Sequence, residues 1–113
     1  MEEKRVRGDR VRKFIDLTVE DGAISNVFRA STADISASGM RLVTTENLAR
    51  GSSYTFTLKR APHLMLRGEV RWVEALGNEG YRAGVHFVQN PPDVATTLGA
   101  FVEAELNRPG SPP

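Results

Sequence analysis

Apolar and polar residues alternate along most of the chain between positions 13 and 88, and this pattern restricts the fold more than any other feature. The alternation is cleanest at 54–59 and 81–87. A period of two is typical of strands that bury one face. Turn-forming residues at 20–22, 36–39, 61–63 and 77–80 separate the alternating stretches. The pattern therefore predicts six strands, near 15–19, 26–34, 40–44, 54–59, 64–72 and 81–87.

These strands follow one another too closely for helices of crossover length to lie between them. Parallel βαβ units are therefore not expected, and short strands joined by tight turns favour an antiparallel barrel or sandwich. On the strand predicted at 64–72, Trp72 falls on the same face as Leu66 and Val70. We therefore expect its indole to fill the core.

The period changes after residue 90, which predicts one helix at about 92–106. Asn90 precedes two prolines, so we expect it to provide the capping side chain at the helix start. An apolar stripe with helical spacing follows, formed by Val94, Leu98, Phe101, Val102 and Leu106. This stripe is expected to cover an open end or flank of the barrel.

A length of 113 residues suits a single domain. We expect a flexible, arginine-rich N-terminal arm at 1–12, a barrel with its helix at 13–106, and a disordered tail at 107–113. The first residues are charged and no apolar stretch follows them, which predicts neither a signal peptide nor a membrane anchor. With no cysteine in the chain, a reducing compartment fits, and we expect a cytoplasmic protein.

The formal net charge of +1 argues against a protein that binds nucleic-acid polymers, which usually needs a marked basic excess. A barrel that binds single strands stays open as a remote alternative. Such barrels present exposed aromatic side chains for base stacking, whereas most aromatic residues here fall on apolar faces.

Catalytic and metal-binding patterns are missing from the sequence. The two histidines, His63 and His86, have no neighbour at ligand spacing, and no phosphate-loop, dinucleotide-binding or zinc-protease motif is present. Nothing in the sequence pairs a serine or threonine with a base. We therefore expect no enzyme, no metal and no cofactor.

The most informative motif is D-x-S-x-x-G, formed by Asp34, Ser36 and Gly39 where one predicted strand ends and the next begins. Residues two apart on a strand project to the same face, so the carboxylate offers an acceptor beside the hydroxyl, which can donate and accept. We expect Gly39 to permit a positive φ and close approach of a ligand. The alternative is that Asp34 and Ser36 only satisfy the amides of their own turn.

This motif resembles the second signature of PilZ domains, the receptors for the bacterial messenger cyclic di-GMP. Val70-Arg71-Trp72, the stretch Tyr81–Phe87 and the terminal helix are similar to the second half of such a domain, so the resemblance covers roughly residues 5–106. It implies a six-stranded antiparallel barrel with a C-terminal helix and a regulatory, non-enzymatic function. It also implies a protein partner in motility, pilus or polysaccharide control, and no membrane.

PilZ domains that bind cyclic di-GMP have an R-x-x-x-R motif just before the first strand. Its two arginines bind the ligand's phosphates and stack on its guanines, and this sequence departs from that motif. Aligning Arg12 with the second arginine puts Gly8 at the first, and aligning Arg10 puts Val6 there. The cyclic di-GMP site implied by the resemblance consists of Arg7, Arg10, Arg12, Asp34, Ser36 and Gly39. The degenerate motif leaves a second interpretation open, an adaptor that no longer binds the nucleotide and contacts a partner constitutively.

Overall fold

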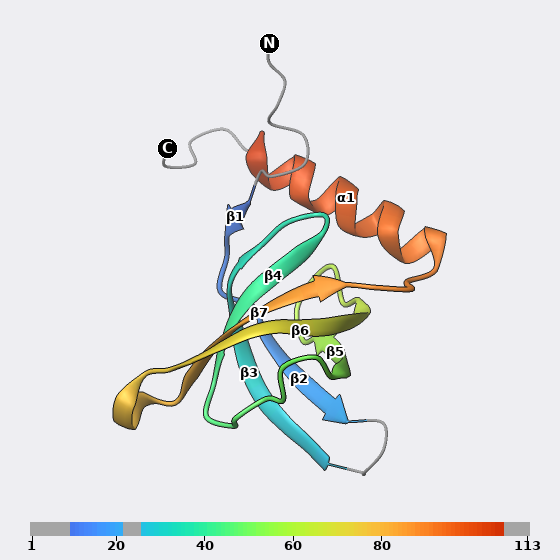
Figure 1. The fold of residues 1–113 in the computed structure, drawn as a ribbon. Coiled ribbons are helices and arrows are strands. Elements are labelled where there is room, and N and C mark those ends of the chain that lie inside the picture. The colour runs from blue at the N-terminus through green and yellow to red at the C-terminus, as the bar shows by residue number, and fades with distance from the viewer. Residues whose placement is uncertain (1–9, 22–25, 108–113) are drawn as a thin grey trace.

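The computed structural model describes residues 10–21 and 26–107 (Figure 1). Its strands, in chain order, are β1 (Val11–Arg12), β2 (Asp16–Asp21), β3 (Asn26–Ile35), β4 (Gly39–Thr44), β5 (Ser53–Leu58), β6 (Met65–Ala75) and β7 (Tyr81–Phe87). A 3₁₀ turn (Gly77–Glu79) joins β6 to β7, and the helix α1 (Pro92–Leu106) follows β7.

Six strands form a closed antiparallel barrel in the order β3-β2-β5-β6-β7-β4, and β4 pairs with β3 to close it. The short β1 pairs with the end of β3. Figure 1 shows α1 across one end of the barrel, while the tip of the β6–β7 hairpin projects away from it. The predicted six-stranded antiparallel barrel with one C-terminal helix is confirmed.

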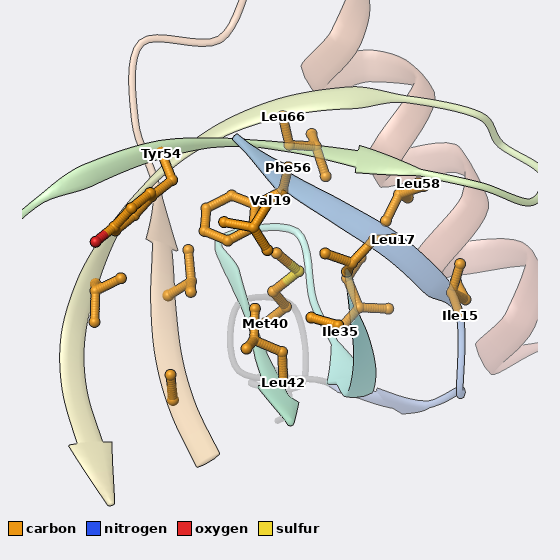
Figure 2. Close-up of a cluster of buried hydrophobic side chains, with 14 of the residues drawn as sticks. Ile15, Leu17, Val19, Ile35, Met40, Leu42, Tyr54, Phe56, Leu58 and Leu66 are labelled. Carbon is orange, nitrogen blue, oxygen red and sulfur yellow. The ribbon is translucent and has the colours of Figure 1, made fainter. Parts of the chain in front are cut away.

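Apolar side chains from the barrel strands and from α1 form one core. Figure 2 shows its centre, where Phe56 lies among aliphatic side chains from neighbouring strands. The largest apolar side chains that are fully buried are Ile15, Leu17, Val19, Ile35, Met40, Leu42, Phe56, Leu58, Leu66 and Val70. Most lie two residues apart along their strands, so the predicted period correctly separates the interior from the outer face.

One predicted turn is wrong, because Glu20 and Asp21 belong to β2. They continue its ladder with β3, opposite Val27 and Asn26, so the strand runs further than its turn-forming residues suggest. Gly22, the last residue of that predicted turn, lies outside the described residues.

The helix α1 spans the predicted residues, but its start is held differently. Pro91 is the N-cap residue, and no side chain makes a capping hydrogen bond to the described helix. The Asn90 amide instead pairs with the backbone of Arg67 on β6, accepting from its N–H at 2.9 Å and donating to its carbonyl at 3.0 Å. The expected capping role of Asn90 is therefore wrong: its side chain fastens the loop before α1 to the barrel.

The predicted burial of Trp72 is also wrong, since the residue is 38% exposed. The pairing of β6 with β7 shifts register between Val70 and Trp72, which breaks the alternation at that point. The indole then lies directly against Gly84 of β7, where an added Cβ would come within 2.1 Å of the indole nitrogen. Trp72 is therefore on the outer face of the barrel.

The residues directly before β2 are attached to the barrel through β3. The buried Thr32 hydroxyl accepts a hydrogen bond from the Ile15 N–H at 2.9 Å and donates to the Lys13 carbonyl. Lys13 also forms an ion pair with Glu105 of α1 at 3.3 Å. The last two residues of the predicted arm form β1, and residues 1–9 and the tail from 108 lie outside the described residues.

In the part of the chain that the structure describes, no helix is both long and apolar enough to cross a membrane.

Candidate functional site

Asp34 lies near the end of β3, where the pairing with β4 shifts register between Thr32 and Asp34. Arginines from two elements hold its carboxylate. Arg10, just before β1, places Nε 2.6 Å from Oδ1, and Arg41 of β4 places Nε and Nη2 each 2.8 Å from Oδ2. The Asp34 side chain is only 12% exposed, so this charge is compensated by two guanidinium groups instead of by water.

Ser36 is fully buried in the turn between β3 and β4. Its Oγ accepts hydrogen bonds from the backbone N–H groups of Ser38 at 3.3 Å and Gly39 at 3.2 Å. Arg10 Nη1 lies 3.4 Å from the same oxygen. The alternative that the motif satisfies its own turn therefore holds for Ser36, whereas Asp34 is bound by side chains from outside that turn.

Gly39 has a different purpose from the expected one. It is part of β4, opposite His86 of β7, and is not among the positive-φ glycines of the described residues. A Cβ at this position would lie 2.3 Å from the carbonyl oxygen of Val85. The expected positive φ is wrong, and glycine is needed because the backbones of β4 and β7 approach closely.

An open pocket of about 310 Å³ lies beside this cluster on the outer face of β4, β6 and β7. Gly84 of β7 lies between two neighbouring strands. Arg41 of β4 is its partner on one side, and Trp72 of β6 is its partner on the other and lies against it. Among the described residues, the lining contains three arginines and no carboxylate: Arg10, Met40, Arg41, Arg71, Trp72, Gly84, Val85 and His86. Guanidinium groups beside an indole suit an anionic ligand that also has flat rings.

The implied arginines are distributed unequally around the pocket. Arg10 lines it and contacts both Asp34 and Ser36. Arg12 is exposed on β1 and does not appear in the described lining, although its Cα lies opposite that of Asp34. Arg7 lies outside the described residues.

Four lining residues were missed from the sequence: Arg41, Arg71, Trp72 and His86. A signal existed for Arg41. A tight turn between the predicted strands at 26–34 and 40–44 brings residues 34 and 41 opposite each other, which is the observed pairing. Alternation already places Arg71 on the outer face, whereas the position of Trp72 depends on the register shift in β6, for which the alternating pattern contains no signal.

The family model for the PilZ domain matches residues 3–104. A sequence search of curated proteins found no match.

Several solved structures share the fold at low sequence identity. The PilZ domain of YcgR from Escherichia coli, solved with c-di-GMP, has a TM-score of 0.69 and 13% identity, with 92% of each chain covered. The Bacillus subtilis inhibitor of motility MotI/DgrA has a TM-score of 0.71 and 16% identity, covering 96% of this chain and 54% of that one. The MrkH–c-di-GMP complex of K. pneumonia has a TM-score of 0.70 and 16% identity, covering 94% of this chain and 53% of that one.

The present chain thus spans about half the length of MotI and MrkH and nearly all of the YcgR domain. These likenesses show the shared fold, and the family model covers most of the chain together with the D-x-S-x-x-G turn. The chain belongs to the PilZ domain family.

Proposed function

We propose that this PilZ domain is a non-enzymatic receptor for cyclic di-GMP, which binds in the pocket beside Asp34. The observation that carries the proposal is the position of Arg10, which contacts both Asp34 and Ser36 at the wall of an open, arginine-lined pocket. Cyclic di-GMP has two phosphodiester charges and two guanine rings. A pocket with three guanidinium groups and one indole is complementary to both features.

Each group would have a separate task when the ligand binds. A guanine edge donates N–H groups, and the Asp34 carboxylate is the acceptor that suits them. Arg10 would move part of its contact from Asp34 to a phosphate or to the face of a guanine. Two further arginines are implied by the resemblance. Arg12 lies on β1 and Arg7 precedes β1 in the chain, so both stay candidates for ligand contacts from the arm.

The similar structures add support. The YcgR domain and MrkH were both solved with c-di-GMP, and both share this barrel. MotI/DgrA is an inhibitor of motility. We propose that this domain likewise transmits its bound state to a protein partner in motility, pilus or polysaccharide control.

A second candidate is an adaptor that does not bind cyclic di-GMP. It is favoured by the present contacts of the motif, because both oxygens of Asp34 are bound by arginines and the Ser36 hydroxyl is bound by its own turn. Ligand would have to replace at least one of these contacts.

Titration with cyclic di-GMP separates the two candidates. Trp72 is the only tryptophan and lines the pocket, so its fluorescence reports binding directly, and calorimetry provides an independent readout. We expect a saturable signal with cyclic di-GMP and none with cyclic di-AMP. Asp34→Ala should weaken binding by roughly 10- to 150-fold, equivalent to one charged hydrogen bond of ~1.5–3 kcal/mol.

Arg82→Ala is the matched control, because Arg82 pairs with Glu74 on the projecting hairpin and does not line the pocket. It should bind like the wild type. Absence of any calorimetric signal with the wild-type protein would favour the adaptor.

A further inference from the structure

The site lacks an arginine pair with R-x-x-x-R spacing, yet the Asp34 carboxylate is held by two arginines. One of them, Arg10, comes from the segment before β1. The other, Arg41, comes from the barrel wall and was not part of the site implied by the sequence. The structure therefore has a pair of guanidinium groups around one carboxylate, assembled from two elements.

We infer that Arg41 supplies the second phosphate-binding guanidinium of the site, in place of the arginine that the arm lacks. This inference rests on the proposed function, because it assigns a residue to the same ligand. Arg41 lines the pocket, and its side chain is 48% exposed, so a ligand can reach it. Its contacts with Asp34 use Nε and Nη2, and Nη1 is its remaining nitrogen.

Local charge distinguishes Arg41 from the third pocket arginine. Arg71 forms an ion pair with Glu69 at 3.2 Å, so its charge is balanced by a carboxylate of its own strand. Among the described residues, Arg10 and Arg41 share the single charge of Asp34, which leaves these three side chains with an excess of one positive charge. A phosphate is therefore attracted more strongly to the side of the pocket where Arg41 lies.

Strand pairing also favours Arg41 over Arg12, because in the described residues β1 pairs only with β3. The backbone of β4 is paired on both sides, with β3 and with β7. A backbone that is paired on both sides is already ordered, so its residues lose little conformational entropy when a ligand binds. An arginine from β4 thus needs only a side-chain adjustment to bind the ligand.

The test compares glutamine variants of Arg41, Arg7, Arg12 and Arg82 in titrations with cyclic di-GMP. We expect Arg41→Gln to weaken binding by roughly 10- to 150-fold. Arg7→Gln and Arg12→Gln should each change affinity less, and the Arg82→Gln control should bind like the wild type. Thermal melting without ligand shows whether each variant is folded, and Arg41→Met, which keeps a long unbranched side chain but removes the charge, replaces Arg41→Gln if that variant is not.

Salt dependence separates a phosphate contact from a purely structural role in holding Asp34. Added salt screens the attraction between a guanidinium and a phosphate, so wild-type affinity should fall with salt more steeply than that of Arg41→Gln. Equal slopes would assign Arg41 to the positioning of Asp34 and overturn the inference.

Failure of the inference differs from failure of the proposed function. If the wild-type protein does not bind cyclic di-GMP, the proposed function is contradicted and the inference with it. If it binds and Arg41→Gln binds equally well, or if Arg7→Gln or Arg12→Gln causes the larger loss, only the role of Arg41 is overturned.

Discussion

The interior of the barrel and the pocket on its outer face are formed by the same strands, but their residues come together for different reasons. Interior side chains such as Phe56 and Leu58 are two apart on one strand, so a local period places them. Arg41 of β4 belongs to the pocket, where its neighbours come from β6, β7 and the segment before β1. The interior depends on periodicity, whereas the pocket depends on register between strands.

This difference predicts that interior variants change stability and pocket variants change ligand affinity. Phe56→Ala should have the largest effect on stability, because Phe56 is fully buried at the centre of the core. A loss of about 3–5 kcal/mol is expected for such a truncation. Urea unfolding measures it, and a loss below about 1 kcal/mol would show that the core is not closely packed around this ring.

Gly39→Ala tests the boundary between the two regions. The added Cβ would meet the Val85 carbonyl, a backbone atom that cannot rotate away, so β4 and β7 must separate. We expect a destabilisation of about 1–3 kcal/mol. At Gly84 the added Cβ would meet the exposed Trp72 ring, which is able to move.

Gly84→Ala should therefore cost less stability than Gly39→Ala, while it changes Trp72 fluorescence. If the two alanine variants unfold at the same urea concentration, the assignment of Gly39 to strand packing is contradicted.

Thr32→Val tests the attachment of the segment that carries Arg10. Valine keeps the shape but leaves the buried Ile15 N–H without its hydroxyl acceptor and the partly buried Lys13 carbonyl without its hydroxyl donor. The expected loss is toward the low end of about 1–3 kcal/mol, as for one buried group left unsatisfied. Hydrogen exchange at Ile15 should accelerate more than exchange in β5, and uniform acceleration would mean that Thr32 does not act locally.

Arg82→Ala should have the smallest effect. Its ion pair with Glu74 is exposed, and such pairs contribute about 0–1 kcal/mol. Thermal unfolding is expected to change little, and a large shift would indicate that the hairpin supports the barrel.

The fold could be predicted from the sequence because strands and helices are indicated by residue patterns within each segment. Strand 81–87 and helix 92–106 have regular patterns, and the structure reproduces their limits. Trp72 was misplaced because a register shift moves a side chain to the other face without changing the residue pattern. Asparagine is a common helix N-cap residue, but the side-chain amide of Asn90 makes hydrogen bonds to the backbone of Arg67 on β6 instead of to the helix.

The candidate site was predicted in part. Asp34 and Arg10 do meet, and the motif placed Asp34 at a strand end. The arm could not be positioned from spacing alone, because its arginines do not follow the family pattern. Arg41 was overlooked although hairpin pairing places it opposite Asp34.

The central claim is that the pocket beside Asp34 binds cyclic di-GMP, and chemical-shift mapping by NMR tests it most directly. Titration of the isotope-labelled protein should shift the Trp72 indole N–H and the amides from Ser36 to Arg41, while those of the hairpin tip at 77–80 stay unchanged. Shifts confined to another face of the barrel, or none at saturating ligand, would contradict the claim.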